Sequence, residues 1–193
     1  MLGLKLPTDP RWVKIAEKNI DEILIDHAHC ELKAASTANS LIMSFPEYSE
    51  LVTEMVSLVK EEMSHFKMVH ERLLKRGITL GKDRKDAYVN QLLKFFPKGG
   101  SRTIQLVHRL LYAALIEARS CERFRLLSEN IEDKELAKFY RDLMVSEANH
   151  YVLFLNFARE FGERTEVDKK WNDLLEFEAE IMKGLGTQET IHG

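Results

Sequence analysis

The sequence repeats one arrangement of acidic and histidine residues in its two halves. Each half has a Glu midway along one long helical segment and, 30 or 31 residues later, a Glu-x-x-His pair in the next segment. Residues three apart are neighbours on one helix face, so both side chains of such a pair can reach the same point. If the halves are related by a pseudo-two-fold, four helices bring all six side chains to one level. These residues are Glu31, Glu62 and His65, and then Glu117, Glu147 and His150.

Apolar residues at three- and four-residue spacing predict long helices along most of the chain. Pro10 suits a first helical turn, Gly77 suits a left-handed cap, and Gly162 ends another apolar pattern. Residues 78–100 are less regular and contain the break "PKGG" at 97–100. The predicted helices cover about 10–43, 46–77, 101–129, 132–161 and 166–183, with a short helix near 85–95.

The helix pattern favours an all-α, ferritin-like four-helix bundle, because the link between the second and third helices is long enough for a crossover. The last helix would be an addition to that bundle. We predict one domain over residues 1–193, with a flexible tail from 183 to 193. Periodicity alone is equally compatible with a plain structural bundle that binds no metal.

The residue types of the repeated arrangement indicate a dinuclear metal site. Four carboxylates and two imidazoles favour iron or manganese over zinc, which prefers a closed tetrahedral set of nitrogen and sulfur ligands. Buried carboxylates without cations would repel one another, and two divalent ions cancel four such charges. The alternative is six residues in unrelated salt bridges. A third pair, Glu189 and His192, lies in the tail and is interpreted as a chance match.

Composition excludes several other classes. Two cysteines, Cys30 and Cys121, cannot build a disulfide framework or a four-cysteine zinc site. No run of about 18 apolar residues occurs, so no membrane span is expected. The N-terminal stretch "MLGLKLPTDPRW" lacks an apolar signal core, which predicts a cytoplasmic protein. Near the candidate ligands, His27 could orient Glu31, although a buried or surface histidine without a role is the commoner case.

Four segments resemble one known family: "DHAHCELKAAS", "EEMSHF", "EARSCERF" and "SEANHY". They are similar to the non-haem di-iron tRNA hydroxylases that act on 2-methylthio-isopentenyl-adenosine, and the resemblance extends over about residues 5–180. It implies a ferritin-like fold, O₂-dependent hydroxylation of the isopentenyl group, and two iron ions held by the six residues named above. The "DHAHCE" segment departs from the commoner family form at His29, which we place outside the metal shell.

The resemblance also implies partners. The substrate would be the anticodon stem-loop of a tRNA, and electrons would come from a separate protein or reductase, because the chain has no rubredoxin-type cysteine set and no Gly-rich dinucleotide loop. We expect a monomer or a small homo-oligomer. The alternatives are a ferritin-like ferroxidase and a rubrerythrin-like peroxidase, neither with an RNA substrate.

The middle of the chain is the predicted RNA-binding segment. Residues 67–109 contain eleven Lys or Arg and three acids, a formal charge of +8, whereas the whole chain carries −3. Such asymmetry suits a polyanion, although an ordinary solvated face is the alternative. Tyr88, Phe95 and Phe96 could stack on bases or belong to the core. The residues proposed for RNA contact are Lys82, Arg84, Lys85, Lys94, Lys98 and Arg102.

Overall fold

The computed structural model describes residues 2–84, 87–185 and 190–192, and none of these residues forms a strand. The chain divides into two compact units. The first unit contains Met1–Glu17, Asp86–Gln188 and His192–Gly193, and the second contains Lys18–Lys85 and Glu189–Ile191. Among the described residues, no helix is long and apolar enough to cross a membrane.

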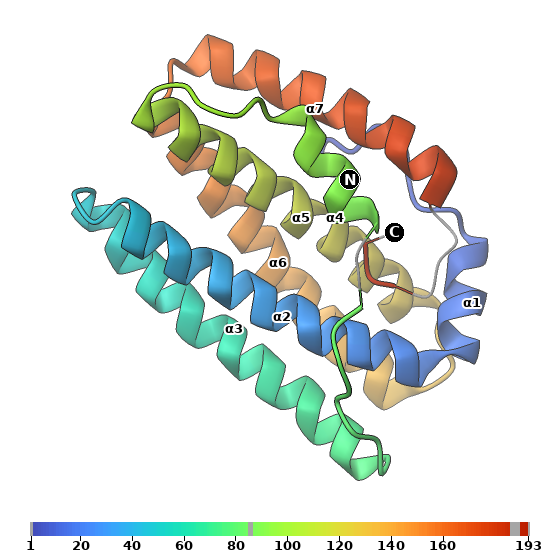
Figure 1. Ribbon diagram of the computed structural model, residues 1–193. Helices are drawn as coiled ribbons and strands as arrows, with labels where there is room; N and C mark the ends of the chain where they lie inside the picture. The colour runs from blue at the N-terminus through green and yellow to red at the C-terminus, as the bar shows by residue number, and fades with distance from the viewer. Residues whose placement is uncertain (1, 85–86, 186–189, 193) are drawn as a thin grey trace. The chain divides into compact units, whose positions relative to one another are not determined.

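The second unit is a hairpin of two long helices, α2 (Ile20–Ser44) and α3 (Ser49–Lys75), which lie side by side in Figure 1. Their facing stripes bury apolar residues at helical spacing, as predicted. Two residues after the end of α3, Gly77 has a φ of 72°, a conformation that favours glycine, and the amide of Ile78 donates to the carbonyl of Leu73 at 2.9 Å. The predicted left-handed cap is therefore present.

The first long helix of the prediction is interrupted. Residues Arg11–Lys18 form a separate helix, α1, and Asn19 lies between it and α2 with φ −124° and ψ 36°. Those angles are not helical, so the apolar periodicity passes through a break that only backbone geometry reveals. As a result, α1 falls in the first unit and α2 in the second.

The first unit is built on the hairpin of α5 (Arg102–Asn130) and α6 (Lys134–Phe161), which pack closely against each other. Each helix begins at a side-chain cap: Ser101 Oγ accepts from the amide of Ile104, and Asp133 Oδ1 accepts from that of Leu136. The hairpin contacts α7 (Arg164–Leu185), and α7 in turn contacts α4 (Ala87–Leu92). A single 3₁₀ turn, η1 (Leu93–Phe95), follows α4.

The turn from α6 into α7 requires a glycine. A Cβ on Gly162 would lie 2.5 Å from Cγ2 of Val167 and 3.1 Å from the carbonyl oxygen of Ala158. Any larger residue would push these two helix ends apart, so the predicted stop at Gly162 also has a packing reason.

A buried ionic cluster connects the parts of the first unit. Arg119 on α5 is fully buried and donates to Glu122 and to Glu178 of α7, the latter at 2.6 Å. Thr8 Oγ1 donates to Glu122 at 2.6 Å, and Tyr88 of α4 donates to Glu178 at 3.1 Å. Charged hydrogen bonds inside the core thus join the N-terminal segment and α7 to α5, and α4 to α7.

The sequence predicted a flexible tail over 183–193. The described residues of this stretch are instead helical or buried. The helix α7 continues to Leu185, and farther on Ile191 and His192 are buried. The Nε2 atom of His192 lies 3.0 Å from Ser120 Oγ, and its ring stacks on that of Tyr88. Residues 186–189 and 193 lie outside the described part of the chain.

Candidate metal centre

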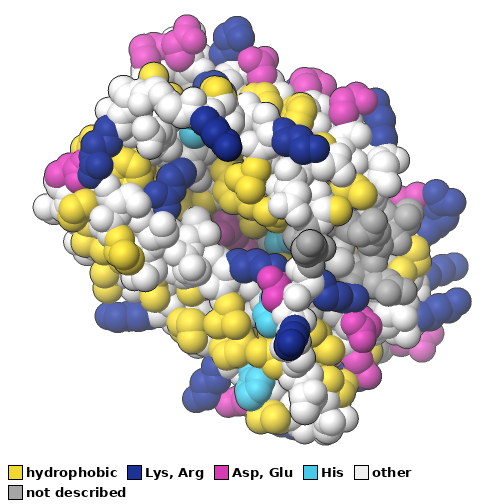
Figure 2. Space-filling view, in the orientation of Figure 1, with side chains coloured by type: hydrophobic (Ala, Val, Ile, Leu, Met, Phe, Trp, Pro, Cys, Tyr) yellow, Lys and Arg dark blue, Asp and Glu magenta, His cyan; other side chains and the backbone are white. Residues whose placement is uncertain are grey.

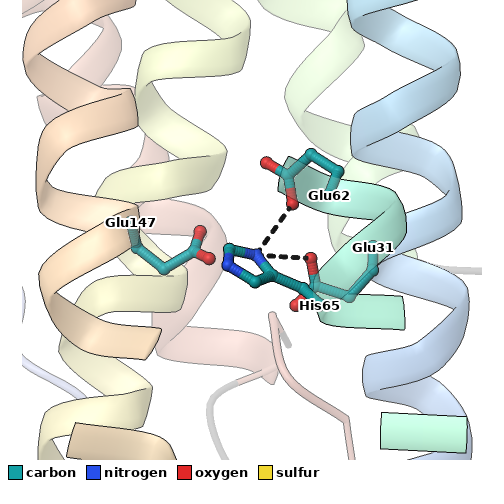
Figure 3. Close-up of side chains that lie close together, drawn as sticks. All are labelled: Glu31, Glu62, His65 and Glu147. Carbon is teal, nitrogen blue, oxygen red and sulfur yellow. Dashed lines mark hydrogen bonds and ion pairs between the residues drawn. The ribbon is translucent and has the colours of Figure 1, made fainter. Parts of the chain in front are cut away.

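The second unit brings three of the predicted ligands together. Glu31 comes from α2, and Glu62 and His65 lie one turn apart on α3; all three are buried. One ligand atom of each lies within 4.8 Å of the others. Figure 3 shows the imidazole of His65 turned towards both carboxylates, with Nδ1 at 3.3 Å from Glu62 Oε2 and 3.6 Å from Glu31 Oε2. The predicted pair and its partner carboxylate therefore converge within this hairpin.

His27 is the residue behind Glu31. It lies one turn before Glu31 on α2, is fully buried, and places Nε2 at 2.6 Å from Glu31 Oε1. This short contact holds one oxygen of the carboxylate while the other faces His65. The four-residue spacing made this role possible in the sequence, and the structure shows the contact.

Contacts within the second unit stabilise a negative charge on Glu31 and a positive charge on His65. Burial acts against ionisation of Glu31, but hydrogen bonds with His27 and His65 outweigh it and hold the pKa of this carboxyl far below its usual range. Burial likewise opposes a charged imidazole, yet hydrogen bonds with Glu31 and Glu62 raise the pKa of His65 to about 10. In the metal-free protein, a proton on His65 therefore takes the place of a cation between two carboxylates.

The first unit holds the matching residues on α5 and α6. Glu117 comes from α5, Glu147 and His150 lie one turn apart on α6, and all three are buried. His150 Nδ1 lies 3.9 Å from Glu117 Oε2. In this hairpin too, the Glu of one helix lies opposite the Glu-x-x-His pair of the other, as the spacing predicted.

The donor set fits the metal class predicted from the sequence. Each unit buries two carboxylates and one imidazole, which are ligands suited to iron or manganese. The nearby thiol does not alter this set, because burial raises the pKa of Cys121 to about 11 and its Sγ donates to the carbonyl of Met144 at 3.3 Å. Glu122, also close in sequence, is engaged by Arg119 and Thr8.

The third Glu-x-x-His pair, Glu189 and His192, forms no cluster of carboxylates and imidazole among the described residues. Glu189 lies outside the described part of the chain, and His192 is hydrogen-bonded to Ser120. His29, the position at which the family segment departs, is half-buried and makes no contact with the carboxylates named above among the described interactions.

The residues predicted for RNA contact lie on the surface where they are described. In the second unit Lys82 is exposed, and Arg84 is exposed but pairs with Glu22 at 3.2 Å. Lys85 lies outside the described residues. The aromatic residues divide: Tyr88 is 1% exposed and belongs to the core, whereas Phe95 and Phe96 are half-buried. In the first unit the exposed basic residues of this set are Lys94, Lys98 and Arg102.

The chain is similar to proteins of one known family. Residues 2–193 match the family model described as tRNA-(MS[2]IO[6]A)-hydroxylase (MiaE). The tRNA 2-(methylsulfanyl)-N(6)-isopentenyladenosine(37) hydroxylase of Pseudomonas putida is 37% identical, over 85% of this chain and 78% of that protein. The protein of the same name from Salmonella typhimurium is 29% identical, over 82% and 76%.

A solved structure supports the fold. "Protein 43 with aldehyde deformylating oxygenase activity from Synechococcus" superposes with a TM-score of 0.91 at 32% identity, covering 98% of this chain and 95% of that one. The predicted fold class, all-α and ferritin-like, is confirmed.

Proposed function

Because the chain belongs to the tRNA-(MS[2]IO[6]A)-hydroxylase (MiaE) family, we propose that it hydroxylates the isopentenyl group of 2-methylthio-isopentenyl-adenosine in tRNA. The protein is then an oxidoreductase whose reaction consumes O₂ and two electrons. One oxygen atom enters a C–H bond of the isopentenyl group, and the other leaves as water after taking up two protons. The observation that carries the proposal is the burial of one Glu and one Glu-x-x-His pair in each of two helix hairpins.

The proposed cofactor is a pair of iron ions, and each unit offers one Glu and one Glu-x-x-His pair as iron ligands. Bound ferrous iron would supply the electrons that activate O₂, while the chain's own residues would hold and tune it. His27 orients Glu31, and His65 must release its proton to serve as a ligand. The ligands of this centre would be Glu31, Glu62, His65, Glu117, Glu147 and His150.

The remaining partners follow from what the chain lacks. With only two cysteines it cannot hold a rubredoxin-type iron site, so the electrons would come from a separate electron-transfer protein or reductase. We further propose a cytoplasmic monomer or small homo-oligomer, since a closed storage shell would exclude a folded RNA.

We propose that the exposed basic residues of the middle segment contact tRNA phosphates. In the second unit, replacing Lys82, Arg84 and Lys85 together with Ala should weaken tRNA binding. It should also flatten the slope of log affinity against log salt by about 0.7–0.9 for each lost phosphate contact. Lys138→Ala removes an exposed lysine of α6, outside the middle segment, and should leave both quantities unchanged. A triple variant with the wild-type affinity and slope would place the RNA elsewhere; Lys94, Lys98 and Arg102 form the corresponding set in the first unit.

The hydroxylase is distinguished from a ferroxidase or a peroxidase by its organic product. The experiment incubates the reduced, iron-loaded protein with O₂ and tRNA that lacks the hydroxyl group, and then analyses the nucleosides by mass. Hydroxylation predicts conversion of the modified adenosine to a species heavier by one oxygen atom. Consumption of O₂ with oxidation of iron and no change in the RNA would instead support the ferroxidase.

A further inference from the structure

A cavity lies within the first unit, between the loop that precedes α5, the first turns of α5 and the turn from α6 into α7. Its volume is about 740 Å³, within the range of small-molecule binding sites. The wall is largely apolar, and Ile104 at its edge is 48% exposed. The side chains that give the cavity its apolar character are Ile104, Val107, Phe161 and Val167.

His108 is the buried polar group that faces this cavity from α5, and Thr103 of the same helix also lines it. His108 is 7% exposed, and its ring packs at 5.3 Å from that of Phe96. No hydrogen bond joins its ring nitrogens to another residue in the part of the chain that the structure describes. A polar side chain this deeply buried is normally hydrogen-bonded. Burial and the nearby charge of Lys170 lower the pKa of His108, so at neutral pH one nitrogen donates and the other accepts.

Three lysines and three acids line the cavity, so their formal charges cancel. Asp173 pairs with Lys169 at 3.0 Å, and Glu163 accepts from the amide of Glu166 at the start of α7. Within the described residues, Lys98 and Lys170 have no acidic partner within 4.0 Å. The cavity thus combines an apolar wall, a histidine that can both donate and accept, and two lysine ammonium groups without a salt bridge to any described residue.

An aromatic surface adjoins the cavity. Phe95 and Phe96 are half-buried with ring centroids 5.2 Å apart, and Lys170 Nζ lies 5.9 Å above the ring of Phe95. Figure 2 shows Lys and Arg side chains, together with Asp and Glu side chains, beside hydrophobic ones on the surface formed by α4 and α7. Aromatic side chains flanked by cations are the usual platform for unstacked bases of single-stranded RNA.

We propose that this cavity binds one unpaired nucleotide of the RNA substrate, with its base on the apolar wall, its edge hydrogen-bonded to His108 and its phosphate near Lys98 and Lys170. This inference rests on the proposed function and adds a recognition site to it. Nine residues of α5 separate His108 from Glu117, about 13 Å along the helix axis. The bound base is therefore a neighbour of the hydroxylated adenosine in the same loop.

The test is a double-mutant cycle between the protein and the RNA. Synthetic anticodon stem-loops, each with one abasic loop position, are titrated against wild-type protein and His108→Ala at fixed salt, with fluorescence anisotropy as the readout. We expect His108→Ala to bind the intact loop about tenfold more weakly. One abasic position should weaken wild-type binding by a similar factor and should weaken His108→Ala no further. If the loss of affinity from His108→Ala and the loss from the abasic site multiply at every loop position, the two are independent, and the proposal is overturned.

A second variant guards against a folding defect in His108→Ala. Ile104→Trp fills the cavity mouth from a half-exposed position and should also weaken binding about tenfold. Val145→Trp places the same side chain on α6, at a residue that is 55% exposed and away from the cavity, and should bind like wild type. Wild-type affinity in both His108→Ala and Ile104→Trp would mean that the cavity does not hold the RNA.

The outcomes separate this inference from the proposed function. Wild-type hydroxylation together with unaltered RNA affinity in the cavity variants would overturn the nucleotide site alone. Position-specific coupling without any hydroxylated product would support the nucleotide site and contradict the hydroxylase. Failure of the wild-type protein to bind the stem-loop would overturn the nucleotide site directly.

Discussion

The Nε2 atom of His27 lies 2.6 Å from Oε1 of Glu31, one turn away on α2, and both side chains are buried. When one carboxylate oxygen is held by a hydrogen bond in this way, the direction of the second oxygen is fixed as well. In metal sites, such outer partners set the direction and the basicity of the ligand. His27 is therefore a positioning residue for Glu31.

Replacing His27 with Ala should weaken iron binding by about 10–100-fold, because Glu31 would lose the group that orients it. The measurement is iron affinity by competition with a chelator. His29→Ala, two residues away on a different face of α2, is the matched control and should keep the wild-type affinity. Equal affinities in wild type and His27→Ala would show that the contact does not serve the metal.

Single removal of a proposed ligand should lower the iron content of the purified protein. Glu117→Ala and His150→Ala take a donor from α5 and α6, and Glu62→Ala takes one from α3. We expect each variant to hold fewer ions than the two proposed for the wild-type protein, and to lose turnover. Glu54→Ala removes an exposed carboxylate from α3 and should change neither. Unchanged iron in both Glu117→Ala and His150→Ala would end the di-iron proposal.

The metal-free protein should lose stability as the pH rises from about 6.5 to about 10. The pKa of His65 is raised to about 10, so its proton favours the folded state. That contribution is complete below the unfolded-state pKa near 6.5 and disappears as pH approaches 10. The lowered pKa of Glu31 adds stability above its ordinary value of 4.5, which is lost in acid.

Thermal melting of metal-free and iron-loaded protein across this pH range is the measurement. Iron should raise the melting temperature at pH 7, because it compensates the buried carboxylates. The decline with pH should be smaller in the loaded protein, since His65 has already released its proton, and smaller also in metal-free His65→Gln. A flat profile for the metal-free protein would contradict the assigned role of His65.

The buried cluster around Arg119 should be far more sensitive to mutation than a surface pair. Arg119→Met removes the cation that pairs with both Glu122 and Glu178 and leaves these carboxylates buried, which should cost about 3–5 kcal/mol in the free energy of unfolding. Arg125→Met, on the same helix, breaks a pair with Glu129 that is 33% exposed at the arginine and should cost about 0–1 kcal/mol. Urea unfolding measures both.

Part of the loss in Arg119→Met should return in the double variant with Glu178→Gln, because the buried carboxylate itself is then removed. A cost for Arg119→Met no larger than that of Arg125→Met would show that the cluster is not a main support of the first unit.

Much of the fold and of the candidate site followed from local patterns in the sequence. The Glu-x-x-His spacing placed Glu62 beside His65 and Glu147 beside His150, since one helical turn determines both contacts. The break at Asn19 was missed because the apolar periodicity continues through it, and its backbone angles depend on packing. The cavity at His108 was missed for another reason: it is assembled from segments far apart in the chain, which no local period encodes.

The central claim is that this chain transfers an oxygen atom from O₂ to the isopentenyl group of a tRNA nucleoside. The most direct measurement supplies isotopically labelled O₂ to the reduced, iron-loaded protein with tRNA bearing the unhydroxylated nucleoside, and determines the mass of that nucleoside. We predict incorporation of one labelled oxygen atom by the wild-type protein and none by Glu117→Ala. A nucleoside that gains no oxygen, or gains it only from water, would contradict the account.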